Sequence, residues 1–254
     1  MYNKKKSLGQ NFLNDESVAD KMIVGLNLKK EETILEIGGG AGAITQKLIK
    51  LSSIYEKLDV YELDNNWANV LKILTKSERN CEIINSNFLD ADLSKYVGDW
   101  KVIGSIPYYI TSPIIHKLLE LKNRPKIIVL MIQKEVADKI LNTKPKSSYW
   151  SNIILGYRVE KIVDIPKTSF NPVPKVDSCA IKLLRNEEDE MKLNKIGFVR
   201  WSKFLHHAYK NPRKMLNKTF DKELLAKICI SSTLRPQNLD SSDWIKIYES
   251  VSIK

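Results

Sequence analysis

The sequence has little cysteine and no metal-ligating pattern. Cys81, Cys179 and Cys229 are odd in number and far apart, with no C-x-x-C spacing. This argues against a disulfide framework or a zinc site and fits a reducing cytoplasm. Adjacent histidines on a helix point in different directions, so His206 and His207 do not form a metal site either. We therefore expect a cytoplasmic protein without a metal.

Long hydrophobic runs are also missing. No stretch approaches the roughly 18 apolar residues that a membrane span requires. The N-terminal segment Met1–Lys6 is polar and basic, and it is not followed by the apolar core of a secretory signal. Neither a membrane protein nor a secreted one is indicated.

Acidic residues are too few to balance the basic ones. The 41 Lys and Arg residues exceed the 30 Asp and Glu residues, which gives a net charge of +11 and a pI of about 9.3. A clustered positive field attracts phosphates and releases their counterions, so this excess favours a nucleic-acid partner. A lysine-rich proteome would raise the charge equally, and the motifs below favour the first explanation.

Short apolar runs alternate with helical patterns over most of the 254 residues. Five runs predict strands: Thr33–Ile37, Asp59–Glu62, Glu82–Asn85, Lys101–Ile106 and Lys126–Met131. Helices are expected at 15–28, Ile44–Leu51 and Trp67–Ser77, and an antiparallel addition at Val159–Ile165 and Ser178–Leu184. Such alternation predicts an α/β fold with a Rossmann-like, mostly parallel sheet of seven strands.

The pattern changes after Arg185. Residues 186–190 form an acidic, turn-like linker, and the remaining residues have helical periodicity without strand alternation. We therefore expect two domains, an α/β domain over 1–185 and a small helical domain over 186–254.

Three predicted strand ends carry residues suited to a nucleoside. Gly38, Gly40 and Gly42 follow the first strand and let the backbone approach a ligand closely. Glu62 ends the next strand and can accept both hydroxyls of a ribose. Asn87 follows the third strand, and its carboxamide matches the edge of adenine. Because the glycines lack the G-x-G-x-x-G spacing of pyrophosphate sites, S-adenosylmethionine fits better than NAD.

A fourth strand end carries Ser105-Ile106-Pro107-Tyr108. An exocyclic base amine is a poor nucleophile, and a catalyst can hold it in line with a methyl group by accepting its hydrogen bonds. Ser105 and the carbonyl of Ile106 or Pro107 offer such acceptors, since the fixed φ of Pro107 holds the backbone in place. Tyr108 offers a face for an unstacked base. The segment is typical of a base-amine methyltransferase.

Ordered motifs along nearly the whole chain resemble one known family. They are S-L-G-Q-N-F-L at 7–13, Q-K-E-V-A at 133–137 and F-N-P-V-P-K-V-D-S at 170–178. Together they resemble the rRNA adenine N6,N6-dimethyltransferases, which include the KsgA/RsmA type and the Erm enzymes. The segments at 211–216 and 235–239 resemble R-R-K-x-L and R-P-x-x-L of the KsgA type, which acts on the small ribosomal subunit.

The resemblance implies roles for particular residues. The family's cofactor positions correspond to Asn11, Leu13, Gly38, Glu62, Asn87 and Ser105. The glycine reasoning above adds Gly40 to this set. The catalytic group is Ser105, Pro107, Tyr108 and Phe170, in which the two aromatic rings would enclose the flipped adenine.

Two positions depart from the family pattern. The family usually has Asp where Asn87 stands, and Asn where Ser105 stands. Serine does occur in the D/N/S-P-P-Y motif of other amino-methyltransferases, which this segment resembles. A register in which Asp90 takes the acidic role stays open, although Asn87-Phe88-Leu89 aligns better.

The resemblance and the charge together imply dimethylation of adenine N6 in small-subunit rRNA and a part in ribosome biogenesis. We expect the protein to be a monomer. Six cations are candidates for binding the RNA: Lys4, Lys5, Lys6, Lys210, Arg213 and Lys214. Two alternatives stay open. One is an Erm-type enzyme acting on large-subunit rRNA, and the other is a weakly active or inactive ribosome-assembly protein that keeps the fold.

Overall fold

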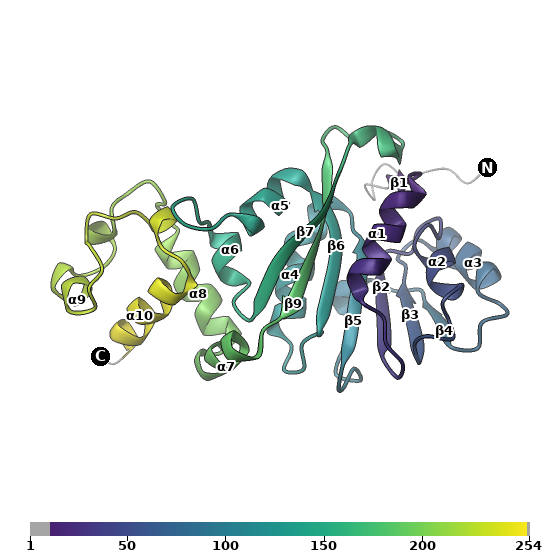
Figure 1. Ribbon diagram of the computed structural model, residues 1–254, viewed down its shortest axis with the longest axis horizontal. Coiled ribbons are helices and arrows are strands. Elements are labelled where there is room, and N and C mark those ends of the chain that lie inside the picture. The colour runs from purple at the N-terminus through teal and green to yellow at the C-terminus, as the bar shows by residue number, and fades with distance from the viewer. Residues whose placement is uncertain (1–10, 253–254) are drawn as a thin grey trace. The chain divides into compact units, whose positions relative to one another are not determined.

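A sheet of seven strands forms the centre of the computed structural model, which describes residues 11–252 (Figure 1). Its strand order is β4-β3-β2-β5-β6-β9-β7. The strands are β2 (Thr33–Ile37), β3 (Lys57–Tyr61), β4 (Cys81–Ile84), β5 (Trp100–Ser105), β6 (Ile127–Gln133), β7 (Tyr157–Ile165) and β9 (Ser178–Arg185). The pairs from β4 through β6 are parallel, and β9 runs antiparallel to β6. The predicted α/β fold with a mostly parallel sheet is therefore confirmed.

The central strands are mostly apolar because helices cover both faces of the sheet. All residues of β6 except Gln133 are buried, and β2 is buried from Ile34 to Ile37. Such continuous burial is typical of parallel strands in α/β proteins. Helix α1 (Glu16–Leu26) crosses the front of the sheet in Figure 1, and its buried residues join the core cluster there.

The remaining helices of the sheet region follow the parallel strands. They are α2 (Thr45–Ile49), α3 (Asn65–Leu74), α4 (Thr111–Glu120) and α5 (Lys134–Leu141). Helix α4 lies behind the sheet in Figure 1 and buries Ile114, Ile115, Leu118 and Leu119. Because every crossover places its loop at the carboxyl ends of the strands, these loops gather at one edge of the sheet.

A second, very small sheet was not expected from the sequence. Strand β1 (Phe12–Leu13) pairs with β8 (Phe170–Asn171) in antiparallel register, with Leu13 opposite Phe170. The pairing joins two segments nearly 160 residues apart, both of which carry motifs of the family resemblance. We call this two-stranded sheet the β1–β8 ribbon.

The chain divides into two compact units. Unit 1 comprises residues 1–137 and 158–185, and it contains the sheet. Unit 2 comprises residues 138–157 and 186–254. The segment 138–157, which the sequence analysis placed in the first domain, therefore groups with the helical unit.

Unit 2 consists of short helices around buried aromatic rings. The helices are α6 (Tyr149–Ile153), α7 (Glu187–Ile196), α8 (Phe198–Ala208), α9 (Lys222–Lys227) and α10 (Ser241–Ser252). Trp201 and Trp244 are fully buried, and the Trp201 indole donates to the carbonyl of Asn152 at 3.0 Å. Asn152 in turn donates to the Tyr209 hydroxyl at 2.9 Å. These bonds explain why the segment 138–157 belongs to this unit.

Within the described chain, no helix is both long and apolar enough to cross a membrane.

A candidate cofactor and base pocket

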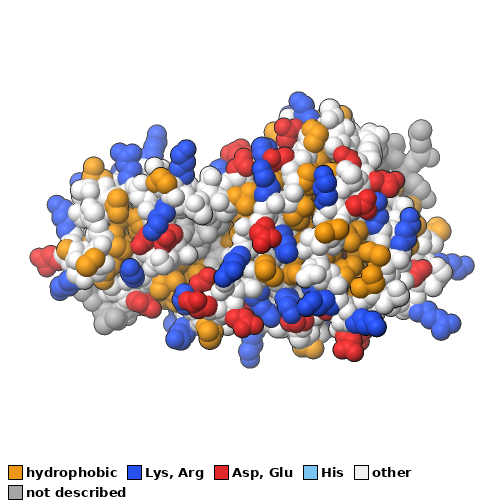
Figure 2. Space-filling view, in the orientation of Figure 1, with side chains coloured by type: hydrophobic (Ala, Val, Ile, Leu, Met, Phe, Trp, Pro, Cys, Tyr) orange, Lys and Arg blue, Asp and Glu red, His pale blue; other side chains and the backbone are white. Residues whose placement is uncertain are grey.

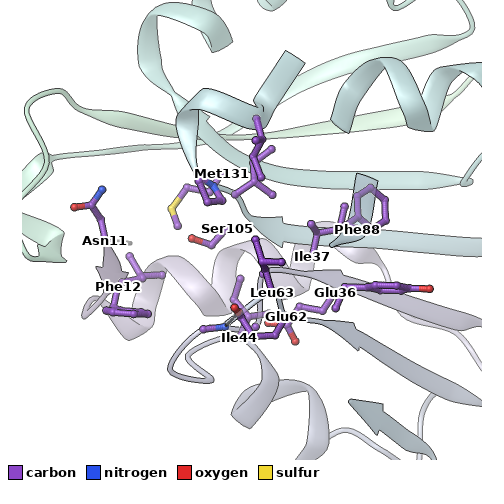
Figure 3. A pocket seen from close by; sticks show the side chains of 18 of the residues that line it. Asn11, Phe12, Glu36, Ile37, Ile44, Glu62, Leu63, Phe88, Ser105 and Met131 are labelled. Carbon is purple, nitrogen blue, oxygen red and sulfur yellow. Dashed lines mark hydrogen bonds between the residues drawn. The ribbon is translucent and has the colours of Figure 1, made fainter. Parts of the chain in front are cut away.

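A pocket opens at the carboxyl ends of β2, β3, β4 and β5 in unit 1 (Figure 3). Figure 3 shows Ser105 near the middle, with Asn11 and Phe12 on one side and Phe88 on the other. All ten residues that the sequence analysis assigned to cofactor or target base within described unit 1 line this pocket: Asn11, Leu13, Gly38, Gly40, Glu62, Asn87, Ser105, Pro107, Tyr108 and Phe170. Their individual roles stay predictions.

The glycine loop is built for close approach. Gly38 and Gly40 have φ values of 76° and 50°, a region that side chains other than glycine rarely adopt. A Cβ on Gly38 would lie 3.3 Å from the carbonyl oxygen of Ser105, and one on Gly40 would lie 3.1 Å from the Phe12 ring. The two glycines therefore leave space that any other residue would fill.

Glu62 connects the glycine loop to the end of β3. Its carboxylate accepts hydrogen bonds from the backbone N–H of Gly40 and of Asp64, both at 2.8 Å. Burial raises the pKa of Glu62, and these two N–H groups oppose the rise because they stabilise the ionised form. An anchored carboxylate at the pocket wall is suited to accept the two hydroxyls of a ribose.

Glu36 is a second buried carboxyl group, which the sequence analysis did not single out. Burial raises its pKa from the ordinary 4.5 to about 7; the Thr45 hydroxyl, which donates at 2.8 Å, opposes the rise, and the charge of Glu62 adds to it. The available signal was an acidic residue in the apolar strand Thr33–Ile37, directly before the glycines. A charge in a strand buried on both faces requires a partner or a function.

Asn87 begins a short 3₁₀ turn, η2 (Phe88–Asp90), after β4. Its side-chain oxygen accepts from the Leu89 N–H at 3.1 Å, and its amide nitrogen donates to the Asp90 carboxylate at 2.8 Å. Asp90, the alternative acidic residue of the sequence analysis, is therefore a partner of Asn87.

The Ser105–Tyr108 segment turns sharply from β5 into the 3₁₀ turn η3 (Tyr108–Ile110). The Pro107 carbonyl accepts from the Ile110 N–H at 3.2 Å, whereas no described residue donates to the Ile106 carbonyl or bonds the Ser105 hydroxyl. Ser105 and the Ile106 carbonyl are thus the acceptors of this segment that are not already engaged by a described donor, and the Pro107 carbonyl keeps one lone pair.

Tyr108 is fixed from its far end. Its hydroxyl shares a hydrogen bond of 2.6 Å with the hydroxyl of Ser178, which is fully buried at the start of β9. Burial raises the pKa of Tyr108, so the phenol stays neutral at physiological pH. The other predicted aromatic residue, Phe170, comes to the same pocket in the β1–β8 ribbon.

The predicted RNA-binding residues fall in two places. Lys4, Lys5 and Lys6 lie outside the described residues. Lys210, Arg213 and Lys214 are exposed in unit 2, and Figure 2 shows many lysine and arginine side chains on the visible face of this unit. Between 191 and 235 the sequence has eleven lysine and arginine residues but only two acidic ones. The segment thus has a net charge of +9 (11 minus 2), against +11 for the whole chain.

No three His, Cys, Asp or Glu side chains among the described residues gather in a way that could hold a metal ion.

The fold and the pocket define an α/β protein of the nucleoside-cofactor methyltransferase class. Solved structures with the same fold include a dimethyladenosine transferase from Plasmodium falciparum and the 23S rRNA methyltransferase ErmE. The first is 26% identical with a TM-score of 0.82, covering 95% of this chain and 98% of the other. The second is 22% identical with a TM-score of 0.75, covering 95% and 100%.

The family follows from sequence comparison. The model of the ribosomal RNA adenine dimethylase family matches residues 1–251, and the chain belongs to this family. Similar relatives include the ribosomal RNA small subunit methyltransferases A of Fusobacterium nucleatum and Mycoplasma capricolum. Both are 34% identical to this chain; the alignments cover 96% of this chain and of the first relative, and 98% of this chain and of the second. The family resemblance stated from the motifs is therefore confirmed.

Proposed function

We propose that this protein transfers two methyl groups from S-adenosylmethionine to N6 of adenine in small-subunit ribosomal RNA. The observation that carries the proposal is the Ser105–Tyr108 segment, which lies in one pocket with the glycine loop and Glu62. Relatives named for the small subunit match nearly full length at 34% identity, whereas ErmE is more distant at 22%.

The pocket residues fit the cofactor. Glu62 is anchored to accept the ribose hydroxyls, and Gly38 and Gly40 leave room in the same pocket. The Asn87 carboxamide, which also lines the pocket, offers a donor and an acceptor to an adenine. When bound, S-adenosylmethionine supplies an electrophilic methyl group on its sulfonium.

The protein's own contribution to the reaction is to position and hydrogen-bond the amine. Ser105 and the Ile106 carbonyl accept hydrogen bonds from the adenine amine and orient its lone pair toward the methyl group. Tyr108 and Phe170 enclose the flipped base, and the Ser178 hydroxyl keeps the Tyr108 ring in place. No strong base is required, because the nitrogen loses its proton after the methyl group has been transferred.

The basic segment of unit 2 is suited to hold the RNA. Its exposed cations Lys210, Arg213 and Lys214 offer contacts to phosphates, which dominate recognition of structured RNA. We infer that the protein works as a monomer in the cytoplasm.

The test supplies labelled S-adenosylmethionine with under-methylated small subunits, large-subunit RNA and DNA in parallel. We expect label in the small subunit alone. Label in the large subunit would favour the Erm-type alternative. Cofactor binding without transfer to any substrate would favour an assembly protein whose catalysis is lost at Ser105.

A further inference from the structure

The turn that follows β4 is held in shape by a charge from another element. This turn comprises residues 87–91. Lys117 of α4 donates to the carbonyl of Leu89 at 2.7 Å and to that of Ala91 at 2.6 Å. Its ammonium group also lies 5.7 Å from the centre of the Phe88 ring. Two carbonyls bonded to one ammonium fix the path of the backbone here.

On this fixed backbone, Asp90 and the Leu89 N–H together set the orientation of the Asn87 side chain. Asp90 is an acceptor when ionised, and the Leu89 N–H is a donor. The carboxamide therefore has its amino group toward Asp90, at 2.8 Å, and its oxygen toward Leu89, at 3.1 Å. Both neighbours select the same orientation, which leaves one N–H and one lone pair of Asn87 for a ligand.

We propose that Asp90 is a positioning residue for the adenine of the cofactor, acting through Asn87. This rests on the proposed function, in which Asn87 meets the adenine. The family usually has an aspartate at position 87. In this chain the negative charge is at position 90 instead. Two acids at these positions would oppose each other at hydrogen-bonding distance, so Asn87 and Asp90 depend on one another.

The two residues can be tested by exchange. The variants are Asp90→Ala, Asn87→Asp, and the double variant Asn87→Asp with Asp90→Asn, in which the hydrogen bond is restored with its donor and acceptor reversed. Calorimetry measures Kd for S-adenosylhomocysteine and for S-inosylhomocysteine, in which a carbonyl replaces the adenine amine. The ratio of the two constants reports recognition of the amine, which a purely structural role would leave unchanged.

We expect Asp90→Ala to weaken binding of S-adenosylhomocysteine about threefold to tenfold and to lower the discrimination ratio, because the Asn87 amino group loses its acceptor and the Leu89 N–H alone then holds the carboxamide. Asn87→Asp alone should weaken binding at least as much. The exchange variant should return to within about threefold of the wild type.

Asp92→Ala is the matched control. Asp92 is an exposed acid two residues from Asp90, and its carboxylate accepts a hydrogen bond from the Ser94 N–H at 2.9 Å. Asp92→Ala should leave both dissociation constants unchanged. Thermal melting of each unliganded variant separates loss of stability from loss of recognition.

Unchanged affinity and discrimination in Asp90→Ala, or an exchange variant as weak as Asn87→Asp, would overturn the role of Asp90. A wild type that binds neither compound would instead overturn the cofactor assignment, and the role of Asp90 with it.

Discussion

Two buried carboxyl groups, Glu36 and Glu62, set the charge of the pocket. Their charges repel each other, and their surroundings differ. Glu62 accepts two backbone N–H groups, whereas Glu36 accepts one hydroxyl from Thr45. Backbone donors at fixed positions stabilise an ionised carboxylate, so Glu62 is the better suited to remain charged for a ribose. Glu36 takes up the proton near neutral pH.

The first prediction concerns the pH dependence of stability. The folded-state pKa of Glu36, about 7, lies above its ordinary 4.5, so the folded protein binds this proton more tightly than the unfolded chain. Glu36 therefore costs stability as pH rises from about 4.5 to 7, by about 3 kcal/mol in total. Glu36→Gln removes the cost and keeps an acceptor for Thr45.

Urea unfolding of wild type and Glu36→Gln at pH 4.5, 6 and 8 checks this. We expect the unfolding free energy of the variant, relative to that of the wild type, to rise from each pH to the next and to remain higher at pH 8. A difference in unfolding free energy that does not vary with pH would contradict the account.

The second prediction concerns Ser105. Ser105→Ala removes an acceptor for the target amine, so kcat should fall about 10²-fold, comparable to the loss of one transition-state hydrogen bond. Ser105→Asn should keep or raise kcat, because the longer carboxamide also accepts. Ser86→Ala, another serine lining the same pocket, serves as control. If Ser105→Ala matched this control in single-turnover methylation, Ser105 would not act on the amine.

At the scale of elements, the β1–β8 ribbon brings two segments that are far apart in the sequence to the same pocket. The Phe12 ring lies 4.8 Å from the Trp67 ring, between centroids, and close to Gly40, while Phe170 lines the same pocket. The glycine loop, Glu62 and the ribbon therefore form one connected wall.

The third prediction compares two glycines with similar backbone strain. Gly40 and Gly98 have φ values of 50° and 68°, but a Cβ on Gly98 would meet nothing within 4 Å. Gly98→Ala should cost about 1 kcal/mol from strain alone. Gly40→Ala should cost more and also raise Kd for S-adenosylmethionine, since the added methyl group displaces Phe12 and disturbs the loop that holds Glu62.

Chemical unfolding and calorimetry on both variants measure these two effects. Equal losses of stability, with cofactor affinity intact in Gly40→Ala, would show that the contact with Phe12 does not matter.

At the scale of the whole molecule, the sequence predicted the large sheet because strands buried on both faces are mostly apolar, as in β2 and β6. It did not predict β1 and β8, because two residues are too short to show a period. The segment 138–157 groups with unit 2, whereas continuity along the chain had placed it in the first predicted domain. Its bonds run to partners far along the chain, for example from the Ser147 N–H to the Gln237 carbonyl at 2.9 Å. The local preferences of residues for helix or strand do not reveal such long-range contacts.

The candidate site was easier to predict than its electrostatics. The glycines, Glu62, Asn87 and the Ser105–Tyr108 segment could be predicted because each follows a strand end. Asn11, Leu13 and Phe170 came from the family motifs. The state of Glu36 and the bond between Asn87 and Asp90 depend on burial and side-chain orientation, which the motifs do not contain.

The fourth prediction concerns the charge of unit 2. Replacing Lys210, Arg213 and Lys214 together with alanine should weaken RNA binding and reduce the slope of log K against log salt by about 2 to 3, if each contacts one phosphate. Lys192→Ala is the control, because ion pairs with Glu188 and Asp189 already neutralise this lysine. Filter binding at four salt concentrations measures the slope. An unchanged slope would place the RNA elsewhere.

The most direct test of the central claim is to identify the product. Small subunits lacking the modification are treated with the protein and S-adenosylmethionine, and the RNA is digested to nucleosides for mass spectrometry. We predict N6,N6-dimethyladenosine in the small-subunit RNA, and its loss in the presence of excess S-adenosylhomocysteine. Small-subunit RNA with unmodified adenine, or with the methyl groups on another base, would contradict the account.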